Sequence, residues 1–238
     1  MENGSKTYSI FSRLIDLIAP RACVVCGSRL SVSEQVMCAV CNLHLPRTHY
    51  AGNAYDNEMA KRFWGQMSVE KAAALFFYES KSEATLVIRQ LKYHGHPEYG
   101  IVLGRQTAQE FMPQHFFDGI DALVPVPLAA NRLRQRGYNQ SMEIAKGIRE
   151  ITRLPIIKDA VTRKTFKESQ TQKSRAERSE NVAHAFELSP KADIRGKHLL
   201  LIDDVVTTGA TAIACGKELL KAQDVKLSVL SIGFTKGA

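Results

Sequence analysis

The chain has 238 residues, of which 45% are hydrophobic, and this is enough apolar material for one ordinary domain and a smaller appended one. No run of about 18 apolar residues occurs, which excludes a predicted membrane span, and no secretory leader is visible at the start. The formal net charge is +8. This charge either favours polyanionic partners, such as nucleic acid or phosphorylated small molecules, or reflects basic residues spread over a solvated surface. We therefore expect a cytoplasmic globular protein.

Two CxxC pairs stand near the start of the chain and are separated by eleven residues: Cys23 with Cys26, and Cys38 with Cys41. Each pair can place two thiolates on one tetrahedral centre. The alternative is a redox dithiol or a disulfide framework, which needs a thioredoxin-like context or an oxidising compartment, and neither is visible. We expect a structural zinc site. Its metal would supply most of the folding free energy of this segment, because few apolar residues lie between positions 21 and 46.

The domain boundaries that we expect follow from changes in composition along the chain. Residues 1–50 hold a short amphipathic helix, over about 8–18, and then the zinc-binding domain. Residues 51–71 are polar and are typical of a linker. The apolar run 72–78 predicts the first strand of a main domain that extends from 72 to 238, and helices are expected over about 82–93 and 99–111.

A short apolar strand is predicted over 121–127, and three arginines follow it within five residues: Arg132, Arg134 and Arg136. Guanidinium groups bind phosphate oxygens in pairs of parallel hydrogen bonds. If this strand belongs to the same parallel sheet as the strand described next, the arginines lie beside a phosphate site. The alternative is a solvated basic loop.

Residues 199–211 carry the most informative pattern in the chain. Four apolar residues, 199–202, predict a strand buried on both faces, and Asp203 and Asp204 follow at its carboxyl end, where open α/β sheets bind ligands. Small residues then lead into a predicted helix over about 212–220, whose first amide N–H groups can bind a phosphate. The carboxylates can accept hydrogen bonds from vicinal hydroxyls and lie near a hydrated Mg²⁺. A phosphate site beside a diol site indicates a ribose 5-phosphate.

This stretch resembles the 5-phosphoribosyl-1-pyrophosphate (PRPP) binding motif of type I phosphoribosyltransferases. The resemblance implies an α/β fold with a central parallel sheet, flanking helices and a small hood. Residues 124–140, the segment from Arg163 to Phe186, and the PRPP motif also occur in the order and spacing of the ComF family, which is competence-associated and GntX-like. The double CxxC fits the zinc domain of that family, so that the resemblance covers nearly the whole chain.

The resemblance also implies roles for individual residues. In such proteins the segment that contains Arg132, Arg134 and Arg136, here called the arginine segment, forms the pyrophosphate loop. The region from about 163 to 181 is a mobile loop that folds over bound PRPP. Mg²⁺ and the three arginines would stabilise the departing pyrophosphate, while Asp203 and Asp204 would hold the ribose hydroxyls. The implied substrate-binding residues are Val206, Thr207, Thr208, Gly209, Thr211, Arg163 and Arg178.

Two functions agree with these patterns. In the first, the protein transfers the phosphoribosyl group of PRPP to an acceptor that the sequence does not identify, and releases pyrophosphate. In the second, it is a non-catalytic accessory of DNA uptake that binds single-stranded DNA and uses PRPP or a nucleotide as a regulator. The acid pair and the arginines favour the first as chemistry. The association of the family with natural competence favours the second as a biological role and implies the DNA-uptake machinery as a partner.

Overall fold

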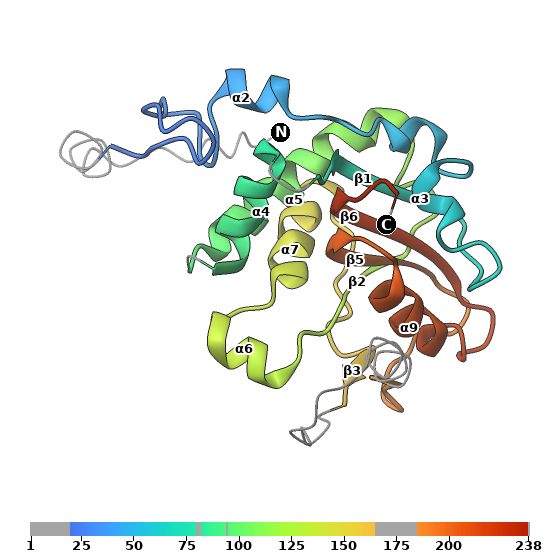
Figure 1. The fold of residues 1–238 in the computed structure, drawn as a ribbon. Helices are drawn as coiled ribbons and strands as arrows, with labels where there is room; N and C mark the ends of the chain where they lie inside the picture. Colours follow the sequence, from blue (N-terminus) through green and yellow to red (C-terminus); the bar gives the residue numbers. More distant parts are fainter. Residues whose placement is uncertain (1–19, 80–81, 94, 165–184, 238) are drawn as a thin grey trace. The chain divides into compact units, whose positions relative to one another are not determined.

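The computed structural model of the chain describes residues 20–79, 82–93, 95–164 and 185–237 (Figure 1). The chain separates into two compact units, and the division falls between Leu45 and Pro46. The helix expected over 8–18 and the loop region 165–184, which includes Arg178, lie outside the described residues. Within the described ranges, no helix is both long enough and apolar enough to cross a membrane.

The first unit contains a tight turn followed by a short helix. Ala22 and Arg29 form an antiparallel bridge across the turn, inside which the backbone N–H of Cys23 donates to the carbonyl of Ser28 (2.8 Å). Helix α2 (Ala39–His44) begins after Cys38, whose Sγ accepts a hydrogen bond from the backbone N–H of Cys41. The first CxxC pair therefore lies on the turn and the second lies at the start of α2.

The second unit is built on a four-stranded sheet in which all neighbouring strands are parallel. The order of its strands is β1 (Ala72–Phe77), β6 (Lys226–Phe234), β5 (His198–Val206) and β2 (Ala122–Pro125). The apolar residues 199–202 of β5 are fully buried, as expected for an inner strand that is covered on both faces. This sheet confirms the predicted α/β class.

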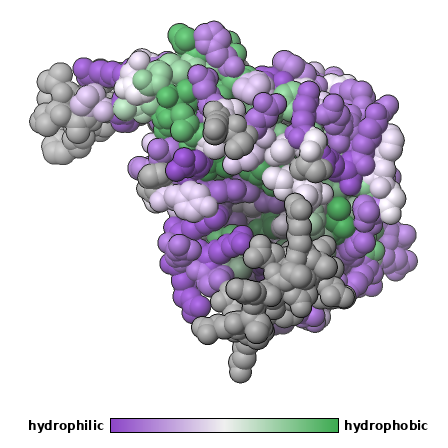
Figure 2. All heavy atoms as spheres, in the orientation of Figure 1, coloured by the Kyte–Doolittle hydropathy of each residue, from purple (hydrophilic) through white to green (hydrophobic). Residues whose placement is uncertain are grey.

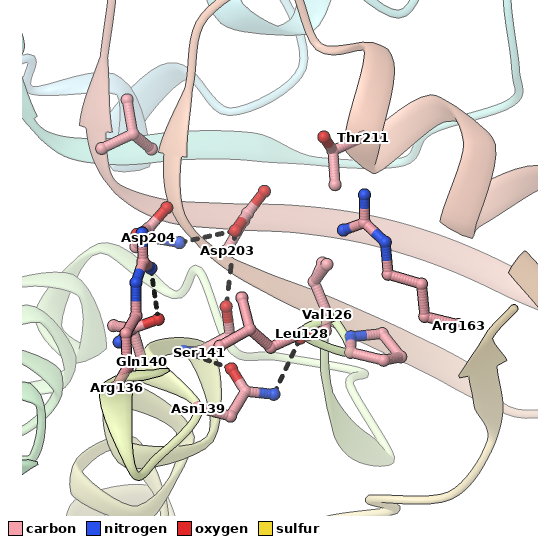
Figure 3. Close-up of a pocket in the computed structure, with 12 residues that line it drawn as sticks. Val126, Leu128, Arg136, Asn139, Gln140, Ser141, Arg163, Asp203, Asp204 and Thr211 are labelled. Carbon is pink, nitrogen blue, oxygen red and sulfur yellow. Dashed lines mark hydrogen bonds between the residues drawn. The ribbon is translucent and has the colours of Figure 1, made fainter. Parts of the chain in front are cut away.

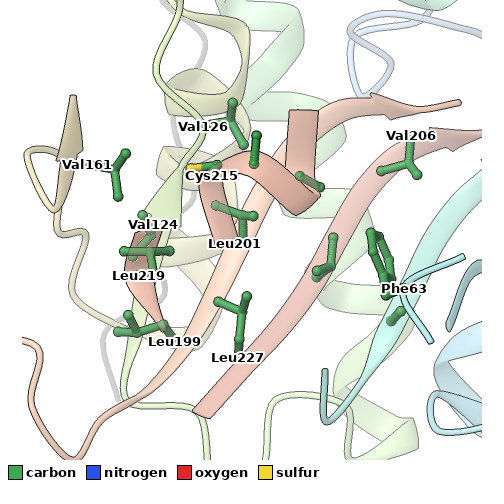
Figure 4. Close-up of a cluster of buried hydrophobic side chains, with 14 of the residues drawn as sticks. Phe63, Val124, Val126, Val161, Leu199, Leu201, Val206, Cys215, Leu219 and Leu227 are labelled. Atoms are coloured by element: carbon green, nitrogen blue, oxygen red, sulfur yellow. The ribbon is translucent and has the colours of Figure 1, made fainter. Parts of the chain in front are cut away.

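Helices cover both faces of the sheet (Figure 1). One face carries α5 (Pro97–Phe111) and α7 (Gln140–Thr152), and α4 (Glu83–Tyr93) packs beside α5. The other face carries α3 (Glu58–Lys61) and α9 (Ala210–Leu219). Figure 4 shows the apolar core on the α9 side, to which Phe63, Leu201 and Leu219 contribute.

The described part of the second unit also contains four further short elements. They are η2 (Met112–Gln114), α6 (Ala130–Arg136), and an antiparallel pair of strands, β3 (Val161–Arg163) and β4 (Phe186–Leu188). The arginine segment after β2 is therefore a short helix, whereas both interpretations of the sequence placed it in a loop. Strand β5 also continues further than expected, because it stays paired with β6 up to Val206. Asp203 and Asp204 consequently lie within the last four residues of β5, and α9 begins at Ala210.

Residues 51–71, which the sequence suggested as a linker, belong to the second unit and pack on its sheet. They contain the end of η1 (Tyr50–Asn53) and all of α3, and the side chains of Met59 and Phe63 are fully buried. Asn57 is a buried polar residue that caps α3 by accepting from two backbone N–H groups and donates to the carbonyl of Ala72. Asn57 is thus a polar residue whose role is to cap a helix, although many other polar residues of the segment are exposed.

Helices α5 and α7 approach each other closely enough that only glycine fits at two positions. A Cβ at Gly104 would lie 2.1 Å from the carbonyl oxygen of Ile144, and a Cβ at Gly147 would lie 2.0 Å from that of Ile101. Backbone atoms within helices cannot move aside without shifting the whole helix. These glycines therefore fix the position of α7, whose first turn lies beside the acid pair described below.

We expect Gly147→Ala to lower the free energy of unfolding by about 2–3 kcal/mol, although alanine is intrinsically the better helix former by about 1 kcal/mol. Chemical denaturation measures this change. The matched control is Gly216→Ala in α9, where the new methyl group meets only the side-chain ends of Met67 and Leu227. The control should lose less stability, and an equal loss in the two variants would contradict the close helix contact.

Candidate functional site

Two adjoining cavities lie at the carboxyl end of β5. The first lies between the arginine segment, the start of α7 and the acid pair, and Figure 3 shows its lining. The second is lined by the end of β5 and the turn that leads into α9, from 205 to 212. Asp203, Val205 and Thr211 line both cavities. A single ligand can therefore extend from one cavity into the other.

The turn from Val206 to Ala210 leads into α9 and leaves the N-terminus of that helix without a side-chain cap at Gly209. Gly209 precedes α9 with φ +80°, a conformation that glycine adopts without strain, and it provides no side chain to cap the helix. Thr208 Oγ1 accepts a hydrogen bond from the N–H of Ala210 at 3.4 Å. The amide groups and positive dipole end of the ten-residue helix α9 face the second cavity. Such a turn binds anions and suits a phosphate group.

The acid pair is held in place by residues from two helices. Asp203 Oδ1 accepts hydrogen bonds from the N–H of Asp204 (2.8 Å) and from Ser141 Oγ of α7 (3.4 Å). Asp204 Oδ2 pairs with Nζ of Lys92 from α4 at 3.0 Å. Burial and the negative charge of Asp204 raise the pKa of Asp203 to about 7. At neutral pH the pair therefore lies close to the point at which one of its two charges is lost.

The structure brings one of the three arginines of α6 to the cavity. Arg136 lines the first cavity, donates to Gln140 Oε1 (2.9 Å) and lies over the ring of Tyr93 at 5.3 Å. Arg132 and Arg134 are exposed on the same helix and do not line either cavity. Helical spacing explains the difference for Arg134, because residues two apart on a helix face different directions. Arg132 lies on the same face as Arg136 but one turn earlier in α6.

A fourth arginine, Arg163, reaches the first cavity from β3. Its guanidinium group lies over the ring of Phe186 at 5.1 Å, and Figure 3 shows the side chain on the same side of the cavity as Thr211. Burial, followed by the charge of Arg132, lowers the pKa of Arg163. The first cavity therefore combines two guanidinium groups with two carboxylates.

The site residues that were not found from the sequence include Lys92, Gln140 and Ser141. Gln140 is 2% exposed, and although its Oε1 accepts from Arg136, its Nε2 has no hydrogen-bond partner within the described residues. A signal for the two residues of α7 exists, since Asn139 is an N-cap directly after the arginine segment. Lys92 gave no such signal, because it lies more than a hundred residues before Asp204.

The four cysteines of the first unit form a cluster in which all Sγ atoms lie within 4.8 Å of one another. The Sγ atoms of Cys26 and Cys38 are 3.8 Å apart, which matches the edge of about 3.8 Å of a tetrahedron with Zn–S bonds of about 2.3 Å. Backbone N–H groups donate to the sulfurs of Cys23 and Cys38, as is usual around metal-bound thiolates. All five cysteines of the chain are free. The cluster has the donor set and the spacing that a structural zinc ion takes.

Comparison with known proteins gives a family match and several relatives. The family model of the phosphoribosyl transferase domain matches residues 99–235, a span that contains every residue lining the two cavities. The chain is 27% identical to the Escherichia coli O157:H7 protein named DNA utilization protein YhgH, over 84% of each chain. It is 23% identical to Competence protein F of Haemophilus influenzae, over 84% of this chain and 90% of that protein. It is 24% identical to Competence protein ComFC of Bacillus subtilis, over 90% of this chain and 85% of that protein.

The raised pKa of Asp203 predicts how stability depends on pH. Between the ordinary value of 3.8 and the folded value of about 7, the folded protein keeps a proton that the unfolded chain has lost. The stability contributed by this group is therefore complete below about pH 4 and is lost as the pH rises to about 7. We expect Asp203→Asn to reduce the decline in unfolding free energy between about pH 4 and 7. The exposed control Asp193→Asn should keep the decline, and an unchanged profile in Asp203→Asn would contradict the raised pKa.

Removal of metal from the cysteine cluster should unfold the first unit and leave the second folded, because the two units are separately compact. We expect about one zinc per chain by atomic absorption and, in Cys38→Ala, loss of the metal with rapid proteolysis before Pro46. Cys215→Ala, which alters a buried cysteine of α9, should retain the zinc. A purified wild-type chain that contains no zinc and resists proteolysis equally well would contradict the site.

Proposed function

This chain belongs to the phosphoribosyl transferase domain family, whose model matches residues 99–235, and on that premise we propose that its two adjoining cavities bind PRPP together with Mg²⁺. The bound phosphoribosyl group would pass to an acceptor nucleophile, with release of pyrophosphate. One observation carries the proposal. An anion-binding helix start and a pair of carboxylates open into neighbouring cavities that share Asp203 and Thr211.

The 5-phosphate of the ligand occupies the second cavity in this proposal. The N–H groups at the start of α9 donate to its oxygens, and the hydroxyls of Thr207, Thr208 and Thr211 add further donors. Val206 and Gly209 bound the turn and let the backbone approach the phosphate closely. The phosphate would thereby fix one end of the ribose.

The ribose hydroxyls lie against Asp203 and Asp204, which accept hydrogen bonds from them when ionised. Breaking the bond between C1 of the ribose and the pyrophosphate builds positive charge on the sugar ring, and the two carboxylates stabilise that charge. The acceptor must then attack C1 from the side opposite the leaving group.

The departing pyrophosphate occupies the first cavity, where Arg136 and Arg163 offset its negative charge. Gln140 supports this assignment, because a buried N–H without a partner costs about 1–3 kcal/mol and a pyrophosphate oxygen would satisfy it. Mg²⁺, which enters with the substrate, supplies further positive charge at the pyrophosphate. We also propose Arg132 and Arg134, on the exposed part of α6, as ligands of the outer phosphate.

A second role is favoured by the net charge of +8 and by the relatives named for competence and DNA utilization. In this role the protein is an accessory of DNA uptake in the cytoplasm that binds single-stranded DNA and the uptake machinery, with PRPP or a nucleotide as a regulator. The zinc-bound first unit would be structural in either case. Both roles use the two cavities as a ligand site, but only the first requires PRPP as substrate and release of pyrophosphate.

We expect Mg²⁺–PRPP to bind the wild-type protein in a calorimetric titration, and the doubly substituted variant Asp203→Asn/Asp204→Asn to lose at least about tenfold in affinity, because amides cannot replace charged acceptors. Asp193→Asn is the matched control and should bind normally. Release of pyrophosphate in the presence of pooled acceptors supports transfer. Binding of PRPP without release, together with salt-dependent binding of single-stranded DNA, favours the accessory role. A wild-type protein that does not bind Mg²⁺–PRPP contradicts the transfer reaction, and one that binds neither PRPP nor a nucleotide contradicts both roles.

A further inference from the structure

The last turn of α4 is part of the site although it lies outside the residues that the family model matches, 99–235. Three consecutive residues of this turn contact site elements. Lys92 Nζ lies 3.0 Å from Asp204 Oδ2, and the ring of Tyr93 lies under the guanidinium group of Arg136. The carbonyl of Leu91 accepts a hydrogen bond from the hydroxyl of Tyr138 at 2.6 Å. The turn thus joins β5 to the arginine segment.

The ion pair between Lys92 and Asp204 differs from the other lysine pairs of the second unit. Only 22% of the Lys92 side chain and 16% of the Asp204 side chain are exposed. By contrast, Lys221 pairs with Glu218 from a position that is 62% exposed. A covered ion pair is screened little by solvent and has a defined geometry, whereas exposed pairs contribute little. The ion pair of Lys92 is therefore strong enough, and its geometry defined enough, to orient the carboxylate of Asp204.

The position of Lys92 also matters for the charge of the cavity. Two carboxylates face a ligand that itself carries phosphate groups, and repulsion between them must be offset by cations. Arg136 and Arg163 line the first cavity, while Lys92 contacts Asp204 without lining that cavity. Lys92 is therefore placed to act through Asp204 rather than by touching the ligand.

We infer that Lys92 is a positioning residue for sugar recognition: by binding one oxygen of Asp204, it holds the other oxygen toward the ribose hydroxyls. This inference rests on the proposed function, since it assigns those hydroxyls to the acid pair. Two consequences follow. Loss of Lys92 lets the carboxylate rotate and weakens the contact with the hydroxyls, but it leaves the phosphate turn before α9 intact. Arginine, which reaches as far and carries the same charge, preserves the contact in large part.

Two sugar phosphates separate this role from a general electrostatic effect. Ribose 5-phosphate presents both hydroxyls, and 2,3-dideoxyribose 5-phosphate presents neither, yet their phosphate charges are equal. The ratio of their affinities therefore reports recognition of the hydroxyls alone. A change in long-range attraction, or a partial loss of folded protein, alters both affinities together and leaves the ratio unchanged.

We expect wild-type protein to prefer ribose 5-phosphate in a calorimetric titration, and Lys92→Met to reduce this preference about tenfold through weaker binding of ribose 5-phosphate alone. Lys92→Arg should restore most of the preference, and the control Lys221→Met should leave it unchanged. A preference in Lys92→Met equal to that of wild type overturns the inference while the proposed function stands. Failure of wild type to bind either sugar phosphate overturns the proposed function, and the inference with it.

Discussion

The site depends on opposite electrostatic environments placed next to each other along one short segment. Asp203 and Asp204 provide negative charge in the last residues of β5, and the start of α9 provides partial positive charge six residues later. Asp203 and Asp204 are held by the regular backbone of β5. At Gly209 the backbone turns into α9, and because glycine has no side chain, the first N–H groups of the helix stay accessible. A ligand with a phosphate at one end and hydroxyls in the middle matches both environments. The rest of the second unit serves to hold this segment in position.

Two neighbouring carboxylates in a buried position lower the stability of the folded protein, and side chains of the neighbouring helices reduce this loss. Burial and mutual repulsion raise the pKa of Asp203, while Lys92 from α4 and Ser141 from α7 stabilise the charged forms. The position of α7 is fixed in turn by the close contact at Gly104 and Gly147. Packing far from the cavities is therefore linked to the geometry of the carboxylates.

Local sequence patterns predicted those parts of the fold and the site whose structure is determined by residues close together in the sequence. The buried run 199–202 predicted an inner parallel strand, and the structure confirms it, because a strand covered on both faces needs no polar positions. The segment 51–71 was expected to be a linker because it is polar and contains residues typical of loops, such as Asn57. In the structure Asn57 is buried and caps α3. Arg136 could not be separated from Arg132 and Arg134 by sequence, because which of them lines the cavity depends on how α6 is placed against it. Lys92 meets Asp204 only through tertiary packing, which no local pattern contains.

A crystal structure of the protein with Mg²⁺–PRPP would show whether one ribose phosphate spans the two cavities. We expect the 5-phosphate to lie against the N–H groups of 207–211, with both ribose hydroxyls within hydrogen-bond distance of Asp203 and Asp204. We also expect a pyrophosphate oxygen at Nε2 of Gln140. A ligand bound elsewhere, or one whose 5-phosphate lies in the first cavity with its hydroxyls away from the two carboxylates, would contradict the proposed binding mode.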